Sequence, residues 1–240
     1  MPTLLIIGGT GFFGKSILDA YKRGLLSPWN IDKVIAMSRN ATKLEFKHPE
    51  LILDTVELLD GDISTVNFLP KSDYVIHAAA STNVSRYLRH NEEEKQNIIK
   101  GTLNYCRLAP KFHKNCKIVF CSSGAIYGYQ SKKVRYLTEG MAFGNIEKLD
   151  EVKKSYAYAK RDAELAIQKL GQVGLNVSVA RCFSFIGKYL PRDQHFAIGN
   201  FIADGLAGKD INVKADRKVY RSYMYADDLV RWLMTLAENA

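Results

Sequence analysis

Residues 4–14, which read LLIIGGTGFFG, decide the fold of this chain. Four apolar residues end at a pair of glycines, as in a short strand that is buried on both faces of a sheet, and residues 13–23 continue as a helix. The start of a helix leaves N–H groups unpaired and carries a partial positive charge. Gly8, Gly11 and Gly14 remove side chains that would keep a phosphate away, so the turn predicts a dinucleotide-binding site. The alternative is a strand-to-helix turn without a ligand.

Further buried runs alternate with helices along the chain. The expected strands after the first are residues 34–37, 55–59, 74–76, 117–121 and 177–180, and the expected long helices are residues 91–108 and 155–170. Strands that alternate with helices imply parallel pairing with crossover helices. The sequence therefore predicts an α/β fold with a Rossmann-type doubly wound parallel sheet over residues 1–180. Residues 181–240 are expected to form a small, partial substrate-binding lobe that is interwoven with this core.

Composition excludes few classes of protein. The 240 residues carry a formal net charge of +9, but the basic residues are spread along the chain and do not alternate with aromatics. A protein that handles anionic ligands is therefore favoured over a nucleic-acid binder. No apolar run approaches the ~20 residues of a membrane span. The four cysteines fit no zinc framework, so no metal is expected, and a reducing, cytoplasmic location is the expectation.

The end of the second expected strand bears on the choice of dinucleotide. An NAD site usually places an acidic residue there to hold the ribose diol, whereas this chain has Ser38 and Arg39. An arginine at that point can hold a 2′-phosphate, which favours NADP over NAD. An Arg39 that stacks on adenine or faces water is the alternative.

Tyr156 and Lys160 are four residues apart on an expected helix and therefore share one face. A nearby ammonium favours the tyrosinate, so such a tyrosine can exchange a proton with a sugar hydroxyl while hydride moves at a nicotinamide. Pairs of this kind also occur by chance. However, Ser123 directly follows the fifth expected strand, and the carboxyl ends of parallel strands are where such folds place ligands. Ser123, Tyr156 and Lys160 are thus the predicted catalytic residues.

Short motifs at the ends of the expected strands complete the pattern. They are Gly61-Asp62-Ile63, His77-Ala78-Ala79-Ala80, Ser122-Ser123-Gly124, Arg181-Cys182-Phe183 and Arg221-Ser222-Tyr223. Together with the glycine turn and the Tyr156/Lys160 pair, they resemble the extended short-chain dehydrogenases/reductases of the NAD-dependent epimerase/dehydratase family. The resemblance covers nearly the whole chain and implies an enzyme that acts on a nucleotide-linked sugar.

The resemblance also implies roles for individual residues. For the cofactor it implies contacts from Phe12 and Phe13 to the pyrophosphate, from Asp62 and Ile63 to the adenine, from Ala78, Ala79 and Ala80 along the cleft, and from Tyr156, Lys160 and Phe183 near the nicotinamide. Asn200 and Arg221 match positions that contact the diphosphate of a nucleotide sugar, and a guanidinium suits diphosphate oxygens. His195 is interpreted as a solvated loop residue rather than a substrate contact, and His77 as structural.

Three departures from the family pattern bear on the reaction. Sugar 4,6-dehydratases carry an Asp-Glu pair after the catalytic residue, but Gly124 and Ala125 stand here, so 4,6-dehydration is disfavoured. Many family members have an asparagine that contacts the substrate after the aromatic residue at position 183. Here Ser184 stands at that place, so this contact is less safely inferred for the present chain. Family members also usually continue for several dozen residues past the segment that ends at Ala240. The chain is therefore either a truncated or a short member, and in the first case part of the sugar pocket is missing.

Three functions remain open on the sequence alone. The first is epimerisation of a nucleotide-linked sugar through a 4-keto intermediate. The second is an NADPH-dependent ketoreductase, which Ser38 and Arg39 favour. The third is a non-catalytic dinucleotide sensor, which the intact Tyr156/Lys160 pair disfavours. The family resemblance also implies a homodimer, through the helices expected at residues 91–108 and 155–170, which the periodicity of these helices alone does not show.

Overall fold

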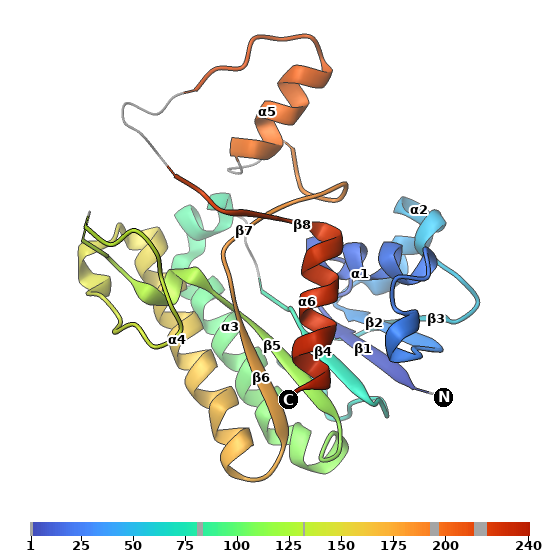
Figure 1. Ribbon diagram of the computed structural model, residues 1–240. Coiled ribbons are helices and arrows are strands. Elements are labelled where there is room, and N and C mark those ends of the chain that lie inside the picture. The colour runs from blue at the N-terminus through green and yellow to red at the C-terminus, as the bar shows by residue number, and fades with distance from the viewer. Residues whose placement is uncertain (1, 81–83, 132, 193–196, 214–219) are drawn as a thin grey trace.

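The computed structural model describes residues 2–80, 84–131, 133–192, 197–213 and 220–240 (Figure 1). These contain a six-stranded sheet in the order β3-β2-β1-β4-β5-β6, in which every neighbouring pair is parallel. The strands are β1 (Thr3–Ile7), β2 (Lys33–Ser38), β3 (Val56–Asp60), β4 (Tyr74–His77), β5 (Lys117–Ser123) and β6 (Asn176–Cys182). This is the strand order of the doubly wound dinucleotide-binding fold, so the predicted Rossmann-type fold is confirmed.

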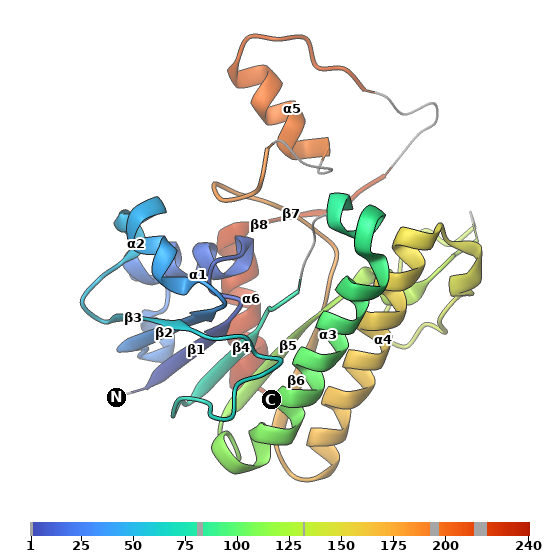
Figure 2. The ribbon, with the colours of Figure 1, turned by 180° about the vertical axis from the view of Figure 1, so that it is seen from behind.

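Helices cover both faces of the sheet. One face carries α1 (Phe12–Lys22) and α6 (Ala226–Glu238), and the other carries α3 (Val84–Phe112) and α4 (Glu151–Gln172), as Figure 2 shows from behind. Leu4 and Ile6 pack under the first pair of helices, while Leu5 and Ile7 pack under the second. Because all four side chains are buried, the first strand reads as an unbroken apolar run rather than as an alternating one.

Short helices fill the connections between these elements. They are η1 (Ser27–Trp29), η2 (Ala41–Lys43), α2 (Leu44–Lys47), η3 (Pro49–Leu51), η4 (Gly124–Tyr127) and η5 (Ile146–Lys148).

Helix α3 is longer than the sequence indicates. It was expected over residues 91–108, but it begins at Val84, passes a non-helical residue at His90, and ends at Phe112. Pro110 lies inside its last turn. The proline removes one backbone donor, yet the N–H of His113 still bonds the carbonyl of Ala109 at 2.7 Å, so the final turn closes beyond the proline.

The C-terminal residues are shared between two locations. Strands β7 (Ser184–Ile186) and β8 (Tyr223–Tyr225) form a separate parallel pair, and α5 (Ala197–Leu206) stands beyond them, away from the main sheet (Figure 1). The chain then returns as α6, whose apolar face is buried against the same core as Leu4 and Ile6. We call residues 184–225 the upper segment; its described parts lie at the carboxyl ends of the strands.

Candidate active site

The glycine turn lies between the ends of β1 and β4. Gly8 has a φ of +101°, and a Cβ there would lie 2.9 Å from the backbone of Ala78 and Ala79. Only glycine fits both the positive φ and this close approach. Because β1 and β4 are neighbours whose chains leave toward opposite faces of the sheet, the turn sits at the topological switch point, where ligands bind in such sheets.

Gly11 and Gly14 do different things in the same turn. Gly11 is the N-cap of α1 and provides no side-chain cap, and the first turn of α1 has no acidic residue, so its N–H groups remain available to a ligand. Gly14 is buried, and a Cβ there would lie 2.2 Å from the carbonyl oxygen of Gly9. Gly14 therefore lets α1 pack onto the turn, and it is absent from the described lining of the cavities that follow.

Two adjoining cavities open along the switch point, and both are lined by Gly8, Thr10, Gly11, Ala78 and Ala80. The first has a volume of about 300 Å³ and the second of about 540 Å³. Their shared wall means that one elongated ligand can occupy both. We call them the first and the second cavity.

The first cavity brings together predicted cofactor residues from three strand ends. It is lined by Ser38, Arg39, Asp62, Ile63, Ala78, Ala79 and Ala80. Within the described part of the chain, the Ser38 Oγ is buried without a hydrogen-bond partner, which is what a site that awaits a polar ligand group shows. Asp60 ends β3 opposite Ser38, but its carboxylate is bonded to the N–H and hydroxyl of Thr42 at 3.0 and 2.8 Å.

The sequence analysis gave no role to one wall of the first cavity. Glu94, Asn97, Ile98 and Gly101 of α3 line it. Positions 94, 97 and 101, and likewise 94, 98 and 101, repeat at steps of three and four residues and therefore share one helical face. This spacing was the signal that the sequence offered. The structure adds that α3 lies over the strand ends, which places this helical face at the cavity.

The second cavity brings together Ser123, Tyr156, Lys160, Phe183 and Arg221, with Phe12 and Phe13 at the glycine turn. Lys160 is only 2% exposed. Its Nζ donates to the carbonyl oxygen of Cys121 at 2.9 Å and lies 5.1 Å from the centre of the Phe120 ring. The Lys160 Nζ also lies 6.0 Å from the centre of the Tyr156 ring. The two side chains of the pair thus face the same space.

Local capping fixes where Ser123 and Tyr156 stand. The Ser123 Oγ accepts from the N–H of Ala125 at 3.1 Å and caps η4. The carboxylate of Asp150 caps α4 by accepting from the N–H of Lys153 at 2.9 Å. Because this cap starts α4 at Glu151 rather than at the predicted residue 155, Tyr156 lies in the second turn of a helix with a fixed beginning.

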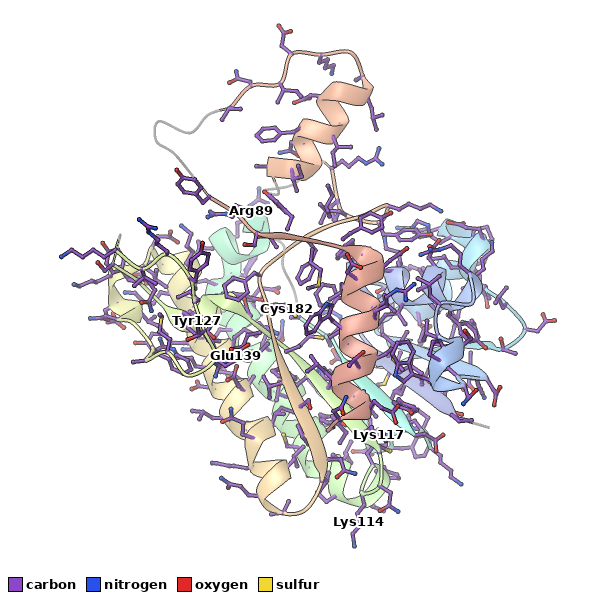
Figure 3. All side chains as sticks on the ribbon, in the orientation of Figure 1. Arg89, Lys114, Lys117, Tyr127, Glu139 and Cys182 are labelled. Atoms are coloured by element: carbon purple, nitrogen blue, oxygen red, sulfur yellow. The ribbon has the colours of Figure 1, made fainter. Side chains whose placement is uncertain are left out.

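A buried ion pair between Glu164 and Arg181 lies next to Lys160 on α4. Glu164 follows Lys160 by one helical turn, and its carboxylate accepts from the hydroxyl of Ser122 at 2.7 Å. It also pairs with the Arg181 guanidinium at 2.7 Å, and this bond raises the pKa of Arg181. Arg181 donates further to the hydroxyl of Tyr127 at 3.0 Å and to the carbonyl of Glu139 at 2.8 Å; Tyr127 and Glu139 are labelled close together beside α4 in Figure 3. This network ties β5, α4 and β6 together.

His77 sits below the switch point and is fully buried. Its ring packs edge-on against Tyr105 and Phe120 at 5.1 and 5.3 Å. Burial, with a smaller contribution from the charge of Lys160, lowers the pKa of His77 to about 3. The imidazole is therefore neutral near pH 7 and packs as an aromatic ring.

The remaining predicted residues are placed as follows. Asn200 lies half-buried on α5 and is not among the described residues that line either cavity. Arg221 is exposed at the rim of the second cavity. His195 lies outside the residues that the structure describes. Over the described ranges, no three His, Cys, Asp or Glu side chains gather as metal ligands, and no helix is long and apolar enough to cross a membrane.

Comparison with known proteins gives one family. The model of the NAD dependent epimerase/dehydratase family matches residues 4–240. UDP-glucuronic acid decarboxylase 6 of Arabidopsis thaliana is 29% identical over 240 residues, which cover 98% of this chain and 66% of that protein. UDP-glucuronate 4-epimerase 4 of the same plant is 24% identical, with 99% and 54% covered. The chain thus spans less than two thirds of the length of these relatives.

Solved structures show the same fold. A UDP-N-acetylglucosamine 4-epimerase from Methanobrevibacter ruminantium M1 superposes with a TM-score of 0.81 at 22% identity, covering 99% of this chain and 73% of that one. The dTDP-glucose 4,6-dehydratase DesIV from Streptomyces venezuelae, determined with NAD bound, gives 0.79 at 22% identity, covering 98% and 72%.

Proposed function

Since the chain belongs to the NAD dependent epimerase/dehydratase family, we propose that it binds a nicotinamide dinucleotide along both cavities and epimerises a nucleotide-linked sugar through a 4-keto intermediate. The observation that carries the proposal is the convergence of Ser123, Tyr156 and Lys160 on the cavity that also contains the glycine turn. A sugar bound there would meet a proton-transfer group beside a dinucleotide cradle.

The residues present fit a dinucleotide. Gly8 admits no side chain where the backbones of β1 and β4 meet, and α1 begins without a side-chain cap. Ser38 lines the first cavity, and its buried Oγ has no hydrogen-bond partner among the described residues. When bound, the dinucleotide supplies the acceptor and donor of hydride. Gly8 lets the dinucleotide come close to the backbone, and the free N–H groups at the start of α1 suit a phosphate. The Ser38 hydroxyl suits a polar group on the ribose side.

Each catalytic residue has one task in this proposal. Tyr156 takes the proton from the sugar C4 hydroxyl as the C4–H bond gives up its hydride, and it returns a proton when the ketone is reduced from the other face. Ser123 donates a hydrogen bond to the reacting oxygen and orients it. Lys160 holds the nicotinamide ribose and keeps a positive charge beside the phenol, and its own position is fixed by the carbonyl of Cys121.

Dehydration is disfavoured for a structural reason as well. The ring of Phe183 lies against Gly124, and a Cβ at Gly124 would come within 2.6 Å of that ring. A larger side chain at this position would have to displace the exposed Phe183 ring. Gly124 and Ala125 provide no acid beside Ser123, and this supports the proposal of epimerisation over elimination of water.

A second candidate is net reduction of a keto sugar by NADPH. Its support is the absence of an acid at the end of β2, where Ser38 and Arg39 line the first cavity, and the engagement of Asp60 by Thr42. We propose NADP as the preferred dinucleotide on the same grounds.

Arg221 is proposed to contact the diphosphate of the nucleotide sugar, since this residue lines the second cavity. Asn200 on α5 stays a proposed contact of the same diphosphate.

A homodimer through α3 and α4 is proposed from the exposed Leu103 and Leu165 on these helices. Sedimentation equilibrium of the wild type and of Leu165→Glu tests it.

The function is tested by binding and product analysis on the purified chain. Thermal shift with NAD and NADP is followed by incubation with UDP-glucose, UDP-glucuronate or UDP-N-acetylglucosamine and by NMR of the sugars. Epimerisation predicts a C4 epimer with no net change in dinucleotide absorbance. Stoichiometric oxidation of NADPH by a keto sugar would favour the second candidate, and no stabilisation by either dinucleotide would contradict both.

A further inference from the structure

Lys15 is a cation of the second cavity that the proposed chemistry does not use. It lies on α1, four residues after the N-cap Gly11, and lines the cavity together with Tyr156 and Lys160. Its Nζ lies 5.6 Å from the centre of the Tyr189 ring. Over the described residues the ammonium has no ion pair or hydrogen bond to an acidic side chain.

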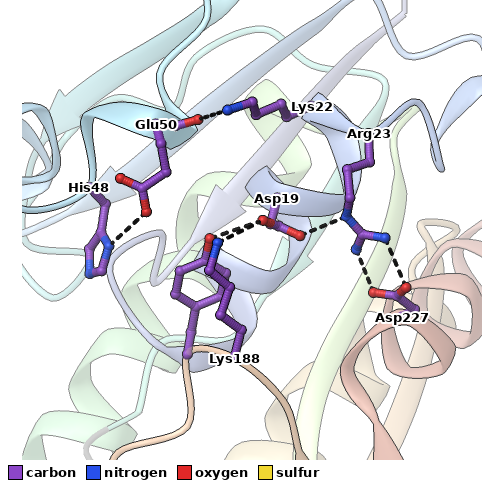
Figure 4. Close-up of polar contacts among 8 residues, drawn as sticks. Asp19, Lys22, Arg23, His48, Glu50, Lys188 and Asp227 are labelled. Carbon is purple, nitrogen blue, oxygen red and sulfur yellow. Dashed lines mark hydrogen bonds and ion pairs between the residues drawn. The ribbon is translucent and has the colours of Figure 1, made fainter.

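The nearest acid on the same helix is already engaged. The carboxylate of Asp19 pairs with Arg23 at 2.7 Å and accepts from the hydroxyl of Tyr189 at 3.0 Å, as Figure 4 shows for Arg23. Arg23 in turn forms a two-pronged pair with Asp227 at the start of α6. Asp19 and Asp227 are thus used to hold α1, the loop at Tyr189 and α6 together.

The second acid on this side is engaged as well. The carboxylate of Glu50 meets the ring of His48 at 3.3 Å, and its backbone carbonyl accepts from Lys22 at 2.7 Å (Figure 4). Glu50 favours the charge of Lys15 only from a distance, and burial and the nearby Lys47 outweigh it, so the pKa of Lys15 is lowered. An anion that entered the cavity would relieve this unfavourable setting.

The direction of the side chain indicates where such an anion would sit. Side chains on an α-helix lean toward its N-terminus. Lys15 follows the N-cap Gly11 by four residues, and Tyr189, whose ring centre lies 5.6 Å from its Nζ, lines the same cavity as Gly11 and Phe12.

We propose that Lys15 binds a diphosphate in the second cavity, and that this is the diphosphate of the dinucleotide held at the start of α1. The inference rests on the proposed function for the presence of a diphosphate ligand. The diphosphate of the nucleotide sugar is the other source of the same chemistry, because Arg221 lines the cavity too.

The test measures binding and needs no turnover. Isothermal titration of the full chain with ADP-ribose and, separately, with UDP is carried out at low and high salt for wild type, Lys15→Gln and Lys15→Arg. The matched control is Lys22→Gln, which removes the same charge from an exposed position on the same helix. Lys15→Gln is expected to weaken ADP-ribose binding about ten-fold and to reduce its salt dependence, because a charge-assisted hydrogen bond is lost. Lys15→Arg and Lys22→Gln should remain near the wild type.

Each outcome decides the inference. Loss for ADP-ribose supports the proposal, whereas loss confined to UDP overturns the assignment to the dinucleotide and gives Lys15 to the diphosphate of the nucleotide sugar. Wild-type affinity and salt dependence of Lys15→Gln for both ligands would overturn it, while the proposed function would stand. Failure of the wild type to bind either ligand would overturn both the inference and the proposed function. The wild-type titration alone shows this result, so it cannot be confused with an effect of the Lys15 variants.

Discussion

The first and the second cavity share one wall but are built from different amounts of the chain. The first is lined by residues between Ile7 and Gly101, which come from the ends of β1, β2, β3 and β4, from the glycine turn and from α3. The second is lined by residues between Gly8 and Tyr223 and includes β5, α4, β6 and the upper segment. The proposed binding of the adenosine side therefore depends on backbone geometry near the switch point, whereas the proposed catalysis depends on contacts between distant segments. Single substitutions should therefore change dinucleotide binding and catalysis independently of each other.

The largest separation is expected from Tyr156→Phe. Removing the phenol hydroxyl takes away the proposed proton-transfer group, so turnover should fall by about 10²–10⁴-fold, while the dissociation constant for the dinucleotide stays nearly unchanged. Steady-state kinetics and dinucleotide titration measure the two effects. Tyr158→Phe is the control, because Tyr158 lies on the same helix and bonds Glu147 at the surface. Activity that survives Tyr156→Phe would refute the proton-transfer role.

Glu164→Gln should disturb the second cavity and spare the first. It leaves the Arg181 guanidinium, whose side chain is 18% exposed, without its counter-charge, which is expected to cost about 2–3 kcal/mol of unfolding free energy. Urea unfolding measures the loss, and the affinity for AMP, which probes the adenosine side proposed for the first cavity, should not change in native conditions. Glu147→Gln, at an exposed ion pair with Lys154, should cost under ~1 kcal/mol. Equal stability of the two variants would show that the buried pair does not support the site.

Arg39→Asp should act on the first cavity only. An aspartate repels a 2′-phosphate and accepts from a ribose diol, so the preference for NADP over NAD should fall about ten-fold, or about 1.4 kcal/mol. Titration with both dinucleotides gives the ratio, and Lys43→Asp, a nearby charge reversal in η2, controls for general electrostatics. If the ratio is the same in Arg39→Asp and the wild type, Arg39 does not contact the 2′ position.

The buried His77 at the end of β4 predicts a pH dependence of stability. Its pKa is lowered from 6.5 to about 3 in the folded chain, so between these values only the unfolded chain takes up the proton. The free energy of unfolding therefore falls as the pH falls through this window, by about 1.4 kcal/mol between about pH 7.5 and about pH 5.5. Urea unfolding at the two pH values measures this, and the difference between wild type and His77→Phe isolates the contribution of His77. An identical pH dependence in both proteins would contradict a neutral, buried imidazole.

The sequence predicted those features of the fold and of the site that depend on residues close together in the chain. The glycine turn and the spacing of Tyr156 and Lys160 are local features, and the alternation of strands and helices was enough for the fold. The Glu164–Arg181 pair was missed because its partners are 17 residues apart on different elements, and no spacing rule connects them. The start of α4 was placed four residues late because residues 151–154 are mostly charged, and only the cap at Asp150 marks the boundary.

The return of α6 to the core makes the upper segment an insertion rather than a tail. The chain leaves the sheet after β6, forms β7 and β8 side by side, and re-enters at Ala226. At the far end of α6, Glu238 bonds Tyr74 and Lys117 at 2.9 and 2.6 Å and secures the helix to β4 and β5. Both ends of the insertion are thus fixed close together, so its length and sequence can change at a small loop-closure cost. A substrate pocket can diversify in such an insert while the dinucleotide cradle is inherited unchanged.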